Sequence, residues 1–437
     1  MRVKTVQVRG MRVSIPPKYA RGPLFRREPG QASPKFSIVV DQIVCSDVTL
    51  TIETDKPGKL PLVFDIRDVT LRDVGRGSAM PFEASLVNPK PVGEIHSTGH
   101  FGPWQNDDPR ETPVDGTYSF THADLNTIKG LGGMLSSTGK YSGTLDEIGV
   151  TGTTDTPDFS LDVSEHPVDL KTEFDATVDG TTGDTKLNSV RATLLHTVLH
   201  VSGTVTRVDG KDGGGHLIEL AVASDRGRVE DLLGLAAKTS PPLMQGALAL
   251  RARLTIPPGR VSVSRKMRLQ GTFTIRGAML SNVKWQDTVD KLSARARGNP
   301  EQAKAGDATQ VESDIDGNFA LADAMVEVPK LNYQMPGAAL KGKYGLDGKV
   351  FDFDGTVRTQ ATASEMLTGW KSIMAMPFDR LLKKTGRGCR CRLRSAGPSR
   401  HRSWGWIWTN WGPRLCRDTR TKGSWNRRRS LRRGFCR

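Results

Sequence analysis

The sequence predicts a mainly β protein built on a long antiparallel sheet. Two observations lead to this prediction: apolar and polar residues alternate in many short runs, and turn signals recur every ~8–12 residues. No strand–helix–strand rhythm is present, which argues against a parallel α/β sheet. The 437-residue chain is 36% hydrophobic and 6% aromatic, a profile that many short strands joined by polar turns would give.

Alternating runs define the expected strands in order along the chain. Val48, Leu50 and Ile52 form an early run, and the longest extends over Val168–Val178, where Asp179-Gly180 ends it. Each run places its apolar side chains on one face of a strand and its polar ones on the other. Further runs lie at residues 64–66, 69–71, 82–86, 199–205, 248–256 and 267–275.

Asp-Gly dipeptides are typical of tight turns between strands. They begin at Asp115, Asp179, Asp209, Asp316, Asp347 and Asp354. Helical spacing of apolar residues is confined to three segments, which we expect to form short capping helices against the sheet: residues 225–238, 283–297 and 363–384. The polar stretch over residues 298–308 is expected to be a loop.

Such a sheet has one apolar face and one polar face, and the few helices are too short to cover the apolar one. The sheet therefore either folds onto itself as a sandwich or solenoid, or curls into a trough with an apolar floor. A trough would suit an elongated apolar partner such as an acyl chain, whereas a sandwich would use the same residues as a closed core. The candidate residues for this face are Phe174, Val178, Leu199, Val201, Leu250, Leu254, Phe273 and Ile275.

The net charge of +16 is concentrated at the C-terminus. Residues 385–437 hold 16 of the 63 Lys and Arg residues but a single acid, Asp418, and they also hold four of the five Cys and five of the eight Trp. The remaining chain has 47 basic and 46 acidic residues. The charge therefore does not indicate specific nucleic-acid binding by the body of the chain.

No motif predicts catalysis, a metal or another cofactor. His96 and His100, like His196 and His200, are four residues apart, but in a strand this spacing separates them by about 13 Å. The tail cysteines lack the paired spacing of zinc sites. Asp107, Asp108 and Arg110 are expected in a solvated loop, and Gly213, Gly214 and Gly215 in a hairpin tip, since no Lys-Ser/Thr follows them.

A family resemblance lies in three stretches of the sequence. The first is FEASLVNPKPVGEIHSTGHFGPWQNDDPRETPVDGTYSF, from Phe82, and the second is LGGMLSSTGKYSGTLDEIGVTGTTDTPDFSL, ending at Leu161. The third, VPKLNYQMPGAALKGKYGLDGKVFDFDGTVRTQATASEMLTGWKSIMAMPFDRLLKK, runs from Val328 to Lys384. Over most of residues 61–384 the chain resembles the AsmA-like proteins of the bacterial envelope, with residues 1–60 supplying N-terminal strands.

The resemblance implies a taco-like open groove of repeating antiparallel strands. It also implies a non-enzymatic role, in which phospholipid acyl chains bind or move along the groove during outer-membrane biogenesis. The family is anchored in the inner membrane by an N-terminal helix, with the groove in the periplasm. Neither a signal peptide nor this helix is visible here, so we expect a fragment.

The C-terminal segment, residues 385–437, departs from the family pattern. Arg, Cys and Trp rise together where the alternation and the acids vanish, which is typical of a GC-rich gene read out of frame. We therefore expect the sheet to end near Lys384 and the tail to be disordered or frameshifted.

Overall fold

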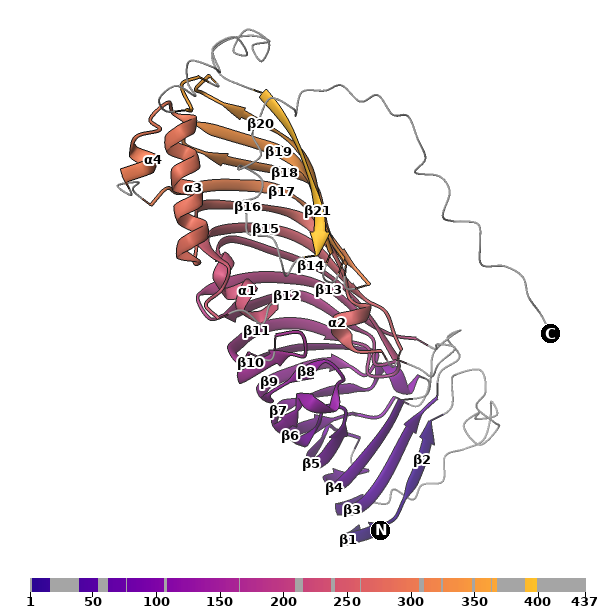
Figure 1. Cartoon of the computed structure of the whole chain (residues 1–437). Helices are drawn as coiled ribbons and strands as arrows, with labels where there is room; N and C mark the ends of the chain where they lie inside the picture. The colour runs from indigo at the N-terminus through magenta and orange to yellow at the C-terminus, as the bar shows by residue number, and fades with distance from the viewer. Residues whose placement is uncertain are drawn as a thin grey trace, which may run out of the picture.

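In the residues that it describes, the computed structural model contains 21 strands, most of them in one long curved sheet (Figure 1). The residues that the structure describes are 2–15, 39–53, 62–75, 77–105, 108–164, 166–208, 215–236, 240–259, 261–305, 310–323, 325–347, 350–362, 364–367 and 390–398.

The first ten strands precede residue 162. They are β1 (Arg2–Arg9), β2 (Arg12–Ile15), β3 (Val39–Ile52), β4 (Leu62–Val74), β5 (Met80–Pro89), β6 (Val92–Phe101), β7 (Pro113–Asp124), β8 (Leu131–Gly132), β9 (Met134–Thr144) and β10 (Glu147–Leu161). Two short 3₁₀ helices flank β7, namely η3 (Pro109–Glu111) and η4 (Leu125–Thr127).

The remaining strands continue the same sheet. They are β11 (Val168–Val178), β12 (Thr185–Leu194), β13 (Thr197–Val208), β14 (Gly215–Arg228), β15 (Met244–Ile256), β16 (Arg268–Leu280), β17 (Ser313–Ala322), β18 (Met325–Met335), β19 (Ala338–Asp347), β20 (Val350–Thr359) and β21 (Arg390–Pro398). The helices are α1 (Val229–Ala236), α2 (Val263–Lys266), α3 (Val283–Ala296) and α4 (Gln302–Ala305).

Strand order follows chain order, so the sheet is a meander. From β3 onward each strand is antiparallel to the next, except that β7 pairs directly with β9 while β8 pairs with the end of β10. β1 and β2 run parallel to successive parts of β3 and form one edge, and β21 forms the other. Because no described strand joins these two edges, the sheet is open. The predicted mainly β, antiparallel fold is confirmed.

Local sequence signals account for several strand details. β11 has the same bounds as the longest alternating run, and the Asp179 carboxylate accepts hydrogen bonds from the backbone N–H groups of Thr181 (2.8 Å) and Thr182 (3.1 Å) in the turn that follows. In β4 the alternation changes phase between Ile66 and Val69. A bulge at this point shifts the register against β5 and keeps both side chains on one face.

Three of the predicted Asp-Gly turns are wrong, because Asp115, Asp316 and Asp354 lie within β7, β17 and β20. The glycine is required there by close cross-strand contacts. A Cβ at Gly116 would lie 2.5 Å from the Tyr141 hydroxyl, and one at Gly317 would lie 3.3 Å from the Phe273 ring. The dipeptide at Asp209 lies wholly outside the described ranges, and the one at Asp347 does so at its glycine.

The expected helices are confirmed in part. α3 matches the prediction, whereas α1 is shorter than expected because residues 225–228 continue β14. The expected loop after α3 is wrong where α4 forms. Only residues 364–367 of the third expected helix are described, and they form a turn.

The sheet does not end near Lys384. β21 lies inside the segment assigned to the tail, and it pairs antiparallel with β20 from Val350 opposite Pro398 to Arg358 opposite Arg390. A strand edge offers unpaired backbone groups to any neighbouring extended segment, whatever its composition. The disorder expected for the tail is therefore wrong for these nine residues, and residues 399–437 lie outside the described ranges.

The apolar face as candidate functional site

The eight candidate residues lie on one face of the sheet. Directly opposed residues share a face, and the register links Phe174 to Val190 and then to Val201. From Val201 the same chain of pairs reaches Val222 and Ala252, which lies between Leu250 and Leu254 on β15. Val178 and Leu199 lie on the same face because they alternate with Phe174 on β11 and Val201 on β13. Leu250 pairs with Phe273 on β16, and Ile275 lies two residues further along that strand on the same face.

The same face carries a continuous line of uncharged residues, one on each of sixteen strands, which we call the apolar row. Successive members are paired across the sheet, from β1 to β18. The row consists of Val6, Ile43, Leu71, Phe82, Gly99, Gly116, Tyr141, Val150, Ala176, Leu187, Gly203, Leu220, Leu254, Leu269, Leu321 and Val326.

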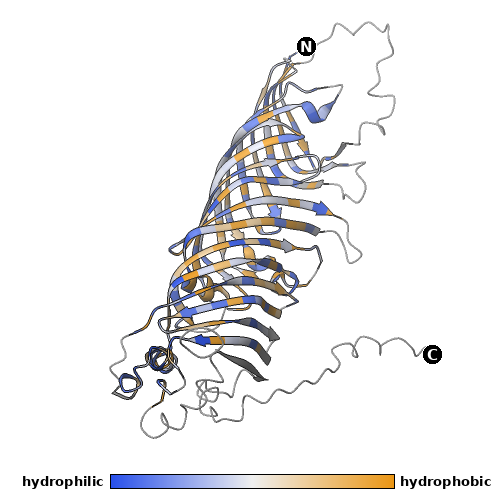
Figure 2. Ribbon diagram, turned by 90° about the horizontal axis from the view of Figure 1, so that it is seen from above, coloured by the Kyte–Doolittle hydropathy of each residue, from blue (hydrophilic) through white to orange (hydrophobic). Residues whose placement is uncertain are grey.

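The apolar row is half-buried rather than covered. Every member has intermediate exposure except Ala176, which is buried. Along β11, residues 169–175 alternate between exposed polar positions and half-buried apolar-face positions, and the two kinds of residue alternate along the ribbons in Figure 2. A packed second layer would bury such side chains almost completely, so the face is open over much of its length.

The face is covered where α1 packs against it, and this region contrasts with the half-buried row. α1 packs there through Val229 against Leu248, Ile275 and Ile315, which are 4%, 5% and 7% exposed. Ile275 thus belongs to a closed core, whereas the other seven candidates are half-buried. A single short helix covers too small an area to shield the whole row.

Aromatic residues on this face repeatedly stand opposite glycines. Phe82 pairs with Gly99, Gly116 with Tyr141, and Gly152 with Phe174. A Cβ at Gly152 would meet the Phe174 ring at 3.0 Å, so the ring lies over the glycine instead of standing clear of the sheet. Sequence reasoning missed these pairs. Glycines inside alternating runs were the available signal, but the partner ring is known only once the register is known.

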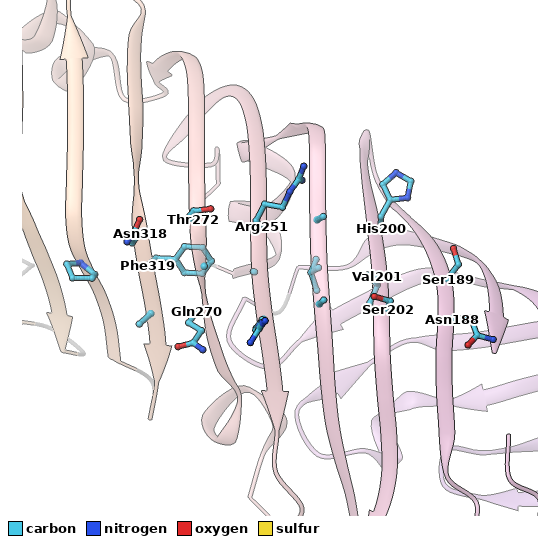
Figure 3. A pocket seen from close by; sticks show the side chains of 18 residues that line it. Asn188, Ser189, His200, Val201, Ser202, Arg251, Gln270, Thr272, Asn318 and Phe319 are labelled. Atoms are coloured by element: carbon cyan, nitrogen blue, oxygen red, sulfur yellow. The ribbon is translucent and has the colours of Figure 1, made fainter. Parts of the chain in front are cut away.

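A hollow in the described part of the chain has a volume of about 860 Å³ and spans β12 to β18 (Figure 3). Adjacent residues such as His200 and Val201 both line it, although their side chains lie on opposite faces. The hollow therefore follows the strand backbones and does not gather convergent polar groups around a point. Arg251, on its edge, forms an ion pair of 2.7 Å with Asp225.

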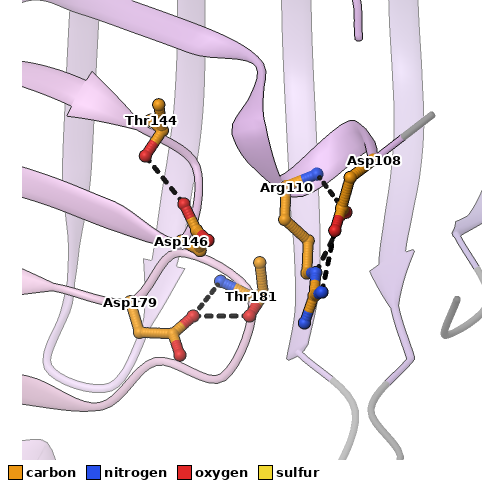
Figure 4. A network of polar contacts seen from close by, with 6 residues as sticks. All are labelled: Asp108, Arg110, Thr144, Asp146, Asp179 and Thr181. Carbon is orange, nitrogen blue, oxygen red and sulfur yellow. Dashed lines mark hydrogen bonds and ion pairs between the residues drawn. The ribbon is translucent and has the colours of Figure 1, made fainter. Parts of the chain in front are cut away.

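Polar pairs at the strand ends act as turn and helix caps (Figure 4). Asp108 is 6% exposed, accepts a hydrogen bond from the backbone N–H of Arg110 at the start of η3, and forms a two-point ion pair with the Arg110 guanidinium. The expectation of a solvated loop is wrong for Asp108, because capping and the ion pair allow its burial. Asp107 lies outside the described residues.

The paired histidines do not share a ligand, because His96 and His100 each contact a different side chain. On β6, His96 Nδ1 is 3.0 Å from Ser85 Oγ and His100 Nδ1 is 3.0 Å from Asp115 Oδ2. His196 lies in the turn before β13, and His200 is exposed on that strand. Within the described ranges, no three His, Cys, Asp or Glu side chains come together as metal ligands. Cys391 is in β21, while the other tail cysteines and Gly213 and Gly214 lie outside those ranges.

Comparison with known protein families, curated proteins and solved structures finds no match to this chain. In the residues covered by the structure, no helix has the length and apolar content needed to cross a bilayer. The open apolar face is therefore the candidate site on which a functional proposal rests.

Proposed function

We propose that this chain is a non-enzymatic protein that binds or conducts phospholipid acyl chains along the apolar row. The supporting observation is the row itself, an uncharged, half-buried line that crosses sixteen strands. An acyl chain laid on it would remove apolar surface of both partners from water, at about 0.8 kcal/mol per fully buried methylene. Such binding needs neither a catalytic group nor a cofactor.

The resemblance to AsmA-like proteins supports the same proposal from the sequence side. By that resemblance we propose that the chain acts in the periplasm, associated with the inner membrane, in building the outer membrane. The alternative of a structural or adhesive protein with a closed core accounts less well for the half-buried row, since a closed core would bury it.

Native mass spectrometry of the purified chain tests the proposal. We expect co-purified phospholipid with the wild type and its loss in Leu220→Glu, because Leu220 belongs to the row and a carboxylate there would have to be desolvated by an acyl chain. Phe174→Glu, on the same face, should act in the same way.

Ala221→Glu is the matched control, since this neighbour on β14 is exposed on the opposite face. It should keep its lipid. Equal lipid content in folded Leu220→Glu and Ala221→Glu, or a wild type that carries none and takes none from vesicles, would contradict the proposal.

A further inference from the structure

The connection between β15 and β16, which carries α2, reaches the far end of β10. Pairing places Ile256, at the end of β15, on one register line with Ile218, Val205, Thr185, Val178 and finally Ile148, at the start of β10. Leu161, at the other end of β10, is thirteen residues away, or about 43 Å along an extended strand. In a flat sheet the α2 connection and the end of β10 would therefore lie at opposite rims.

The two rims nevertheless meet in a polar contact between two buried serines and an exposed carboxylate, Asp162. The Ser262 hydroxyl donates to Asp162 Oδ2 at 2.8 Å, and Ser264 Oγ lies 2.7 Å from Ser262 Oγ. The Val263 N–H donates to the Lys129 carbonyl at 3.0 Å. Ser262 and Ser264 are only 5% and 8% exposed.

Gly130 fits this contact closely. Its φ of +100° suits glycine, and a Cβ there would lie 2.9 Å from both Ser262 Oγ and the Val263 nitrogen. The Asp162 N–H donates to the Gly130 carbonyl at 3.2 Å, which ties the two loops of this rim together. We call residues 261–267, with this contact, the strap.

The loop that the strap touches lies over the apolar face. Ala123 and Thr156 belong to that face by register, and they are 0% and 1% exposed. A Cβ at Gly133, in the same loop, would lie 3.1 Å from the Thr156 methyl group. The contact with Ser262 therefore joins the two rims on the apolar side of β10 to β15, and Ala176, the buried member of the apolar row, lies on one of the strands between.

We infer that the strap crosses the apolar row and controls the release of a bound acyl chain, so that a chain on β10 to β15 lies beneath it and exchanges when the Ser262–Asp162 contact opens. This inference rests on the proposed function, because it concerns the same face. It adds a point of control: the apolar row on β1 to β9 and on β17 and β18 would load freely, whereas the strapped part would hold its chain.

Ser262→Asp tests the strap, because it places a second carboxylate against Asp162. Val261→Asp is the matched control, since Val261 is the adjacent residue, is 55% exposed and makes none of these contacts. Amide hydrogen exchange at Val263 reports strap opening. Release of a pyrene-labelled phosphatidylcholine, loaded from vesicles that contain it, into vesicles of unlabelled phosphatidylcholine reports exchange from the face.

We expect Ser262→Asp to speed both Val263 exchange and lipid release by about tenfold or more, with the amount of lipid bound unchanged and Val261→Asp like the wild type. Faster Val263 exchange with unchanged release would overturn the control role while leaving lipid binding intact. A wild type that takes up no labelled lipid would instead refute the proposed function itself. If neither Ser262→Asp nor Gly130→Val raises Val263 exchange, these contacts do not hold the strap and the inference is wrong.

Discussion

At the scale of single residues, glycines opposite aromatic rings set the shape of the apolar face. A Cβ at Gly317 would meet the Lys330 carbonyl and the Phe273 ring, whereas one at Gly345, on β19, would meet nothing within 4 Å. Alanine substitution at both positions therefore distinguishes the effect of crowding from the general effect of adding a methyl group to a strand glycine.

We therefore expect Gly317→Ala to lower the free energy of unfolding by about 1–3 kcal/mol, because the added methyl must displace backbone. Gly345→Ala should be neutral or slightly stabilising. Urea denaturation of both variants measures this, and equal midpoints would show that the Gly317 contact is not restrictive.

Asp162 gives the strap a pH dependence. Burial alone would raise its pKa, but the hydrogen bonds of Ser264 and Ser262, the positive charge of Arg265 and its own backbone contact bring that pKa below the ordinary value of 3.8. Since the pKa is lowered by folding, the ionised carboxylate stabilises the contact above the ordinary value, and this stabilisation is lost as the pH falls through the lowered pKa.

Amide exchange at Val263, corrected for the intrinsic pH effect, should therefore be constant near neutral pH and rise below about pH 4. Asp162→Asn should abolish this rise. A rise of the same size in that variant would assign it to another group.

At the scale of elements, α1 divides the apolar face into a covered and an uncovered part. Ile275 is buried beneath it, while Leu254, on the neighbouring strand, is half-buried. Loss of a covered side chain leaves a cavity, whereas an uncovered site already contacts solvent.

Ile275→Ala should thus cost about 2–4 kcal/mol of stability, and Leu254→Ala about 1 kcal/mol. Thermal or urea unfolding distinguishes them. Similar large losses at both sites would mean that Leu254 is also covered, contrary to an open face.

Alternation was enough to predict individual strands, such as β11, and to place seven half-buried candidates on one face. It could not separate Asp179-Gly180, a real turn, from Asp316-Gly317, which lies inside a strand, because the ring opposite Gly317 comes from β16. The continuity of the apolar row depends on register between many strands. The strap depends on the coiling of the whole sheet, which no local pattern encodes.

At the scale of the whole molecule, the sheet is one curved surface with open edges. The apolar row forms a path for an acyl chain along this surface, and the strap crosses that path. The strands alone would leave that path exposed to water over most of its length. Its burial by an apolar ligand is the simplest way to account for a line of sixteen uncharged positions without a second layer of strands.

The most direct test is site-specific photocrosslinking, with benzoylphenylalanine placed at Leu254 of the row or at Arg253 on the opposite face, in the presence of phospholipid vesicles. Lipid adducts should form at position 254 and be absent at 253. Equal adducts at both positions, or none at 254, would contradict the claim that the apolar row binds acyl chains.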